Sequence, residues 1–177
     1  MLRVAGFSFR VRSRPIEEVR GPGEAPRDYA LRLARAKAEA AWQHSDEREG
    51  KEVVLGADTI VVLGNGVLEK PADAGDARRM LEALSGRSHT VITGICLRHR
   101  RGAILDSEST EVHFTALEPG EIDAYVASGE PMDKAGAYGI QGLASKFIDR
   151  IEGCYFNVMG LPLARVYRHW KSLETEA

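Results

Sequence analysis

The sequence predicts one compact domain in which α-helices and β-strands are mixed. A length of 177 residues with 44% hydrophobic content suits a single core. Segments with helical spacing of apolar side chains alternate along the chain with uncharged or β-branched runs typical of strands. The clearest helices are expected at 28–43, 73–85 and 161–173, and the clearest strands at 53–63, 90–97 and 103–114.

The N-terminal segment has a period-two pattern, in which Phe7, Phe9 and Val11 alternate with polar or basic residues. This alternation predicts a first strand with one apolar and one basic face. The arginines at 10, 12 and 14 either clamp phosphate or form a solvated strand face. A proline- and glycine-rich loop at 21–26 follows the acidic pair Glu17-Glu18.

The helix expected at 28–43 is rich in Ala, Leu, Arg, Lys and Glu and lacks Gly and Pro until its end. Lys37 falls within its apolar stripe, one turn beyond Leu33 and Ala34. Such a lysine either lays its stem along apolar surface with its ammonium in water, or faces an anion in a cleft.

Asp58 lies in the middle of the uncharged run 53–63, which otherwise has the character of a buried strand. Desolvating an unpaired carboxylate costs several kcal/mol, roughly 2 or more in any protein-like reference. Asp58 therefore needs a cation, a metal or hydrogen-bond donors nearby, and it is the first candidate for chemistry.

The next segments carry turn and cap signals. Gly64-Asn65-Gly66 suits a hairpin, and Lys70, directly before Pro71, is expected to be extended and outside the next helix, which Asp73 caps. Residues 44–51 are a charged connection, and a further strand is expected around 147–151. Thr115 to Glu118 has capping-box spacing before a short helix that ends at Ser128-Gly129.

Glycines recur every three residues in the segment 133–142, at Gly136, Gly139 and Gly142. Glycine lets the backbone approach a ligand closely or turn with a positive φ. Together with Asp133, Lys134 and Gln141, the segment has the composition of a pocket wall more than of a linker.

Composition excludes several classes of function. A formal net charge of −2 gives no overall field toward nucleic acid or membranes, and no apolar run approaches the roughly 20 residues of a membrane span. We expect a cytoplasmic protein with reduced thiols at Cys96 and Cys154. The histidines lack zinc-ligand spacing, and neither a phosphate-binding Gly-x-x-x-x-Gly-Lys loop nor a Gly-x-Ser-x-Gly elbow is present.

The remaining polar candidates form a chemically coherent set. Two acids with two lysines could bind a divalent cation, Mg²⁺ or Mn²⁺, together with a polyphosphate, and two neutral side chains could contact a base edge. The acids are Glu18 and Asp58, the lysines are Lys37 and Lys70, and the neutral residues are Thr59 and Gln141.

Several motifs in order along the chain resemble the Maf family of nucleoside triphosphate pyrophosphatases. They are the helical run 32–38, Gly56-Ala57-Asp58-Thr59, Glu69-Lys70-Pro71, the long segment 125–142 and Val158-Met159-Gly160-Leu161-Pro162. The resemblance implies an α/β fold with an elongated mixed sheet flanked by helices and two lobes around a central cleft. It also implies metal-dependent hydrolysis of the bond between the α and β phosphates, and it suggests a homodimer.

The resemblance assigns roles to the same residues. Asp58 would accept a proton or bind the metal, Glu18 would be a second acid at the metal, and Lys37 and Lys70 would hold the triphosphate. Thr59 and Gln141 match the branch of the family that acts on dTTP and UTP, whereas a glutamine after the aspartate would indicate 7-methyl-GTP.

The chain departs from the family pattern at its start. The family's first strand, its Ser-x-Ser-Pro-Arg-Arg loop and the following helix have no counterpart before Gly6. Either the given start lies inside a longer gene product or the chain is a truncated homologue, and we expect a single domain over 1–177 that is N-terminally truncated relative to the family. An alternative function is a non-catalytic nucleotide-binding or cell-division regulatory homologue, because losing the arginines could cost on the order of 10² to 10³ in rate for each.

Overall fold

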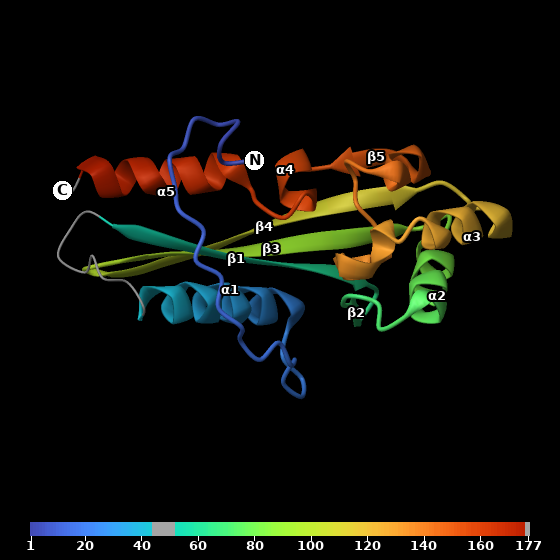
Figure 1. Ribbon diagram of the computed structural model, residues 1–177, viewed down its shortest axis with the longest axis horizontal. Coiled ribbons are helices and arrows are strands. Elements are labelled where there is room, and N and C mark those ends of the chain that lie inside the picture. The colour runs from blue at the N-terminus through green and yellow to red at the C-terminus, as the bar shows by residue number, and fades with distance from the viewer. Residues whose placement is uncertain (44–51, 176–177) are drawn as a thin grey trace. The chain divides into compact units, whose positions relative to one another are not determined.

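The computed structural model describes residues 1–43 and 52–175 and consists of helices around a five-stranded sheet (Figure 1). The charged connection expected at 44–51 lies outside the described residues. The elements in chain order are α1 (Pro26–Trp42), β1 (Val53–Leu63), β2 (Gly66–Leu68), α2 (Ala74–Leu84), β3 (Ser88–His99), β4 (Gly102–Phe114), α3 (Pro119–Ala127), the 3-10 helices η1 (Glu130–Asp133), η2 (Ala135–Ala137) and η3 (Leu143–Phe147), β5 (Ile148–Glu152), α4 (Tyr155–Val158) and α5 (Leu163–Thr175).

The sheet is antiparallel and has the strand order β2-β1-β3-β4-β5. The turn predicted at Gly64-Asn65-Gly66 is confirmed, because β1 and β2 pair with Leu63 opposite Gly66 and Gly64 has a φ of 59°. The predicted α/β class and the expected main helices and strands are confirmed. Within the described part of the chain, no helix combines the length and apolar character needed to cross a bilayer.

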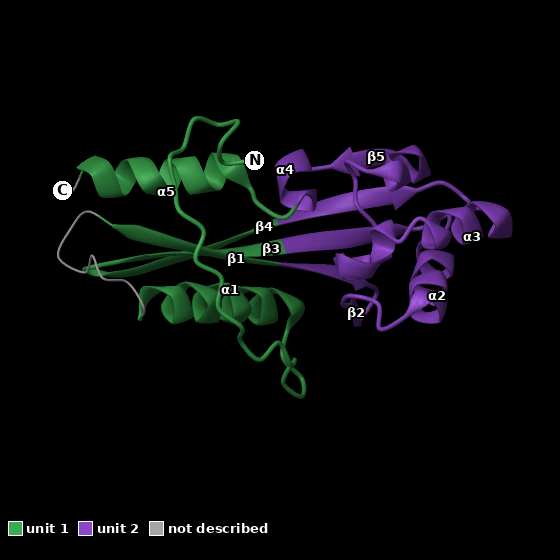
Figure 2. Cartoon of the chain, in the orientation of Figure 1, with its two compact units in different colours: residues 1–58, 93–108, 160–177 green, residues 59–92, 109–159 purple. Residues whose placement is uncertain are grey.

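The chain forms two compact units (Figure 2). Unit 1 comprises Met1–Asp58, Thr93–Glu108 and Gly160–Ala177, and unit 2 comprises Thr59–Ile92 and Ser109–Met159. The long strands β1, β3 and β4 each pass from one unit into the other. The expected single domain and central cleft stay predictions.

Unit 1 places one helix on each face of its strands, because alternate residues of β1 and β3 point to opposite sides. On one face, Ile95 and Leu97 pack with Val166 of α5, together with the partly buried Leu55 and Ala57. On the other face, Cys96 and Val54 pack with Ala34 and Ala38 of α1. Residues of even number in β1, which include Asp58, therefore face α1.

Glycines let α1 approach these strands at backbone distance. A Cβ on Gly56 would lie 2.3 Å from the carbonyl oxygen of Ala34 and 2.6 Å from the amide nitrogen of Ala38. A Cβ on Gly94 of β3 would lie 2.4 Å from the carbonyl oxygen of Ala30. No side chain fits at either position unless helix and strand separate, so the two glycines fix the height of α1 above the sheet.

We therefore expect Gly56→Ala to destabilise the protein by about 1–3 kcal/mol, the usual cost of overpacking a core. The clash is with backbone atoms, which cannot rotate away as a side chain would. Urea denaturation measures the effect, with Gly120→Ala as the control, since a Cβ on Gly120 of α3 meets nothing within 4 Å. Equal stability of the two variants would contradict the close packing of α1 on β1.

Unit 2 has a larger core formed by α2, α3, the 3-10 segments and the remaining halves of the strands. His89 is buried in it, with its Nε2 2.7 Å from the hydroxyl of Tyr138 and its ring edge-on to Phe114. Burial disfavours the charged imidazolium and, with a smaller contribution from His113, lowers the pKa of His89 to about 4. The histidine is therefore neutral in the folded protein near pH 7.

The folded state should lose stability between about pH 6.5 and pH 4 because of His89. In this window the unfolded chain, with a pKa near 6.5, binds a proton that the folded protein excludes, so falling pH favours unfolding. The shift corresponds to roughly 3 kcal/mol. Denaturation at a series of pH values should show a shallower acid loss for His89→Gln than for the unsubstituted protein. Parallel pH profiles would exclude His89 as the cause.

Two local expectations are wrong. The segment 7–14 forms no strand: Val11 is 79% exposed, and Phe7 packs edge-on against Tyr167 and Trp170 of α5. The alternation therefore reflects one docking side chain and not a paired, pleated face. The capping box before α3 is formed by Glu118 and Glu121, three residues later than expected, while the hydroxyl of Thr115 donates to the carbonyl of Phe147.

Candidate active site

The most unusual buried group of unit 1 is the carboxylate of Asp58, which is 9% exposed in the middle of β1. It lies two residues after Gly56 and so on the same face of the strand. The close approach at Gly56 brings α1 over this face, and Lys37 sits directly before Ala38, the residue that a Cβ on Gly56 would meet. The glycine thus determines which helical side chain reaches the buried acid.

Lys37 is the cation that Asp58 requires. Its Nζ lies 2.5 Å from Oδ1 of Asp58 and 2.7 Å from Oε1 of Glu18. The lysine does not merely place its ammonium in water: it occupies the space between two carboxylates and remains 30% exposed. Burial opposes its charge, but the hydrogen bonds to Asp58 and then Glu18 outweigh this effect and raise the pKa of Lys37.

Glu18 comes from an extended segment that hydrogen bonds fasten to α1. The hydroxyl of Tyr29 donates to the carbonyl of Glu18 at 2.9 Å, and Arg32 donates to the carbonyl of Val19 at 2.9 Å. Arg32 also forms a bidentate ion pair with the carboxylate of Glu24, with hydrogen bonds of 2.7 and 2.8 Å. This hydrogen bond, with that from the Gly21 amide, lowers the pKa of Glu24 to about 2.

The residues that hold Glu18 in place were not identified from the sequence. Tyr29 and Arg32 lie one turn apart on α1, on the side that leads toward Lys37. This spacing is the feature of the sequence from which their shared contact could have been predicted. An extended segment with two prolines has no periodic pattern of apolar residues, so its contact with a helix could not be predicted from the sequence.

The other three candidates, Thr59, Lys70 and Gln141, belong to unit 2. Thr59 follows Asp58 on β1 and so points to the other face of the strand. Lys70 is exposed and lies outside α2, as expected, and its charge contributes to lowering the pKa of Asp133, after the larger contributions of Lys134. The amide of Gly136 donates to the carbonyl of Glu69 at 3.1 Å, so the Lys70 segment meets the glycine-rich loop.

The glycine-rich loop that carries Gln141 is held by a carboxylate that the sequence did not single out. Glu130 accepts a hydrogen bond from the hydroxyl of Tyr125 at 3.0 Å and from the amide of Leu143 at 3.0 Å. A Cβ on Gly142 would lie 2.1 Å from the same carboxylate, so a side chain at this position would have to displace Glu130. Gln141 itself is exposed on this loop.

The structure thus brings Glu18, Lys37 and Asp58 together in unit 1, and it brings the segments of Lys70 and Gln141 onto connected loops in unit 2. The first group suits a hard divalent cation, because two carboxylates already converge on one positive charge and offer only oxygen ligands. The same ammonium could bind a phosphate oxygen. The group can therefore bind charge of either sign and accept a proton.

Comparison with known proteins gives consistent matches. A family model described as "Maf-like protein" matches residues 1–173. Proteins named "dTTP/UTP pyrophosphatase" are similar over most of the chain: that of Koribacter versatilis is 51% identical over 95% of this chain and 85% of its own length. That of Syntrophomonas wolfei is 48% identical over 94% and 87%, and that of Bacillus cytotoxicus is 42% identical over 100% and 91%.

Proposed function

The chain belongs to the family of Maf-like proteins, and we propose that it is a nucleotide pyrophosphatase that hydrolyses dTTP and UTP to the nucleoside monophosphate and pyrophosphate. The name of the relatives at about 50% identity supports this activity. The structural observation that carries it is the Lys37 ammonium held between the carboxylates of Asp58 and Glu18.

In this proposal Asp58 accepts a proton from the attacking water. The water oxygen forms a bond to the α-phosphorus, the bond from that phosphorus to the bridging oxygen breaks, and pyrophosphate leaves with the electron pair. Lys37 next to Asp58 keeps the carboxylate ionised before the reaction and can then contact phosphate oxygens as their charge grows.

Glu18 and Asp58 would hold the divalent cation, Mg²⁺ or Mn²⁺. When bound, such an ion neutralises charge on the phosphate oxygens. Glu18 is suited to this role because its side chain is 40% exposed and reaches the same point as the buried Asp58. The hydrogen bonds that Tyr29 and Arg32 donate to its segment limit how far this glutamate can move.

Lys70, Thr59 and Gln141 are proposed to contact the substrate. Lys70, exposed beside the glycine-rich loop, offers a second cation for the triphosphate. The side-chain amide of Gln141 offers an NH₂ group as donor and a carbonyl oxygen as acceptor, and the edge of a pyrimidine base has groups of both kinds to pair with them. Thr59 would provide a hydroxyl from the face of β1 opposite to that of Asp58.

If Gln141 contacts the base, Gln141→Ala should raise the KM for UTP about tenfold, since one or two hydrogen bonds are lost, and leave kcat within about threefold. Inhibition by inorganic triphosphate, which has no base, should be unchanged. Steady-state kinetics with both compounds separates the roles. Weaker inhibition by triphosphate would instead place Gln141 at the phosphates.

The direct test is incubation of the purified protein with dTTP or UTP and Mg²⁺ or Mn²⁺, followed by separate assays for pyrophosphate and orthophosphate. Pyrophosphate with equimolar monophosphate supports the proposal, whereas orthophosphate with a nucleoside diphosphate would contradict the bond assignment. Calorimetric titration with UTP distinguishes the non-catalytic alternative, which predicts binding without turnover.

A further inference from the structure

A second group of metal-ligand residues lies in unit 2, on the pairing of β4 with β5. The register places Glu111 opposite Glu152 and His113 opposite Arg150. Because alternate residues share a face, all four side chains lie on one side of this two-stranded segment. Two carboxylates directly across an antiparallel pair repel each other, and a cation bound between them would remove that cost.

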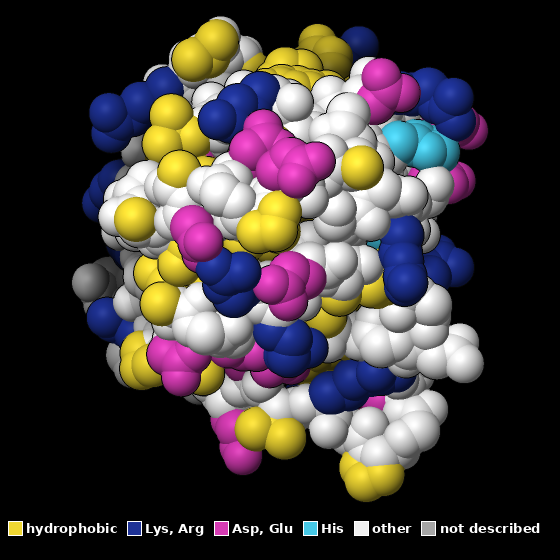
Figure 3. Space-filling model, turned by 90° about the vertical axis from the view of Figure 1, so that its right-hand side faces the viewer, with side chains coloured by type: hydrophobic (Ala, Val, Ile, Leu, Met, Phe, Trp, Pro, Cys, Tyr) yellow, Lys and Arg dark blue, Asp and Glu magenta, His cyan; other side chains and the backbone are white. Residues whose placement is uncertain are grey.

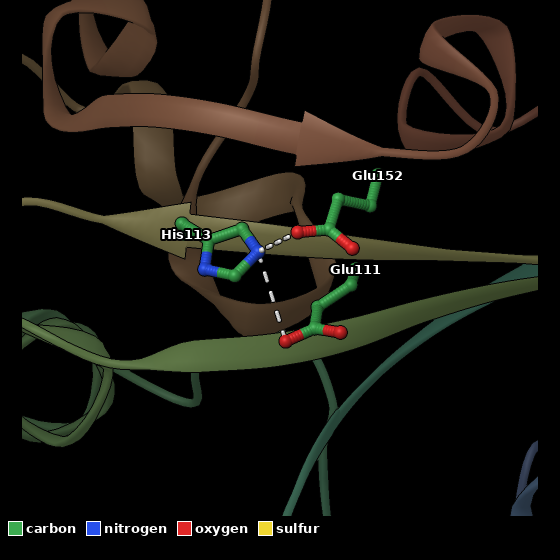
Figure 4. Close-up of side chains that lie close together, drawn as sticks. All are labelled: Glu111, His113 and Glu152. Carbon is green, nitrogen blue, oxygen red and sulfur yellow. Dashed lines mark ion pairs between the residues drawn. The ribbon is translucent and has the colours of Figure 1, made fainter.

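The ligand atoms of Glu111, His113 and Glu152 point toward one another (Figure 4). Nε2 of His113 lies 3.3 Å from Oε1 of Glu152 and 3.7 Å from Oε1 of Glu111. The three ligand atoms all lie within 4.8 Å of one another, and no other group of three such residues meets this condition in the described parts of the chain.

These spacings agree with a tetrahedral shell around zinc. Bonds of about 2.0–2.2 Å from zinc to nitrogen and oxygen place tetrahedral ligands about 3.3–3.6 Å apart. Two of the three edges already lie near this range. Both glutamates are about half exposed, so a rotation of their side chains can shorten the third edge. Figure 3 shows one face of the molecule, on which histidine side chains lie at the surface among acidic and basic side chains.

The hydrogen bonds around His113 are compatible with metal binding through Nε2. Arg150 can only donate, and its Nη2 lies 3.2 Å from Nε2, which suits the tautomer with a lone pair on Nε2. In that tautomer Nδ1 donates to the hydroxyl of Ser88 at 2.8 Å. Metal-binding histidines commonly have this arrangement, in which a partner on one nitrogen fixes the ring and leaves the other free for the ion.

Arg150 is the group that a metal ion must displace. It lies 2.8 Å from Oε1 of Glu152, but both side chains are more than half exposed, and such a pair contributes only about 0–1 kcal/mol. A divalent ion bound by two carboxylates and an imidazole can outcompete it. The arginine would then turn to solvent.

We propose that Glu111, His113 and Glu152 form a surface site for a divalent transition-metal ion of the zinc class, with a water molecule as the fourth ligand. The combination of one imidazole with two carboxylates suits such an ion better than Mg²⁺, which prefers oxygen ligands alone. The site would tie β5 to β4, and it shares no residue with the group of Glu18, Lys37 and Asp58 in unit 1.

Isothermal titration of the full chain with Zn²⁺, in excess Mg²⁺ to occupy oxygen-only sites, tests the proposal. We expect one Zn²⁺ per chain, at least about tenfold weaker binding in His113→Gln and about tenfold weaker binding in Ser88→Ala. Arg150→Gln should bind more tightly, because the competing cation is gone. His99→Gln, at the end of β3, is the matched control and should leave the isotherm unchanged.

Two results would overturn the proposal. One is a Zn²⁺ isotherm for His113→Gln that matches the unsubstituted protein, because any zinc binding would then occur elsewhere. The other is unchanged or weaker binding in Arg150→Gln, which would show that the cluster is an ion-pair network built around the arginine. These surface substitutions leave the core of unit 2 intact, so circular dichroism should be the same for all variants.

Discussion

Replacing Asp58 by Asn should lower the rate of pyrophosphate release from dTTP and UTP by about 10²–10⁴-fold. Asparagine keeps the size of the side chain but cannot accept the proton of the attacking water, and loss of a general base typically has this effect. It also carries no charge to pair with Lys37, whose Nζ is 2.5 Å from Oδ1 of Asp58. Pyrophosphate assays at saturating and limiting substrate measure the change in kcat and in kcat/KM.

A matched control is Asp28→Asn, which removes an exposed aspartate from the first turn of α1 in the same unit. Its rate should stay within about twofold of the unsubstituted protein. Since the carboxylate of Asp58 is expected to act mainly in the transition state, UTP binding by Asp58→Asn should change less than kcat. A rate within tenfold of the original would exclude Asp58 as the proton acceptor.

The sequence indicated Asp58 and Lys37 as separate candidates because each violates a pattern. An acid in an uncharged strand needs a partner, and a lysine in an apolar helical stripe either reaches water or faces an anion, but neither pattern shows that the two side chains meet. The length and spacing of the main helices and of the hairpin at 64–66 could likewise be predicted, because helical periodicity and glycine turns depend on residues that are close in the sequence.

What the sequence could not give was the geometry that depends on distant contacts. The distance between α1 and β1 depends on Gly56 lying under Ala34 and Ala38, and no pattern in either segment shows that they face each other. Glu18 was assigned through the family resemblance, since its segment has no period. The wrong prediction of a strand at 7–14 has the same cause. Apolar and polar residues alternate there, but the pattern does not show whether a neighbouring strand pairs with the segment.

The Glu111–His113–Glu152 cluster illustrates the same limit. The histidine and Glu111 are two residues apart, but Glu152 joins them only through the register of β4 with β5. The absence of zinc-ligand spacing along the chain therefore excludes sites made from one segment, and it does not exclude a site assembled across strands.

Lys37→Met should destabilise the protein by about 2–3 kcal/mol and also lower the rate. Methionine fills the apolar stripe of α1 but removes the ammonium from between the carboxylates of Asp58 and Glu18. Removing one partner of a fully buried pair costs about 3–5 kcal/mol, and the lower range applies here because the lysine side chain is 30% exposed. Urea denaturation measures the loss, with Lys171→Met on α5 as the control.

Two further measurements separate this electrostatic cause from simple loss of packing. The double variant with Asp58→Asn should recover part of the stability, because the uncompensated charge is then gone. Mg²⁺ should also raise the melting temperature of Lys37→Met more than that of the unsubstituted protein, since the ion can take the place of the missing ammonium between two oxygen ligands. Equal responses to Mg²⁺ would show that Glu18 and Asp58 do not form a cation site, whatever their part in the reaction.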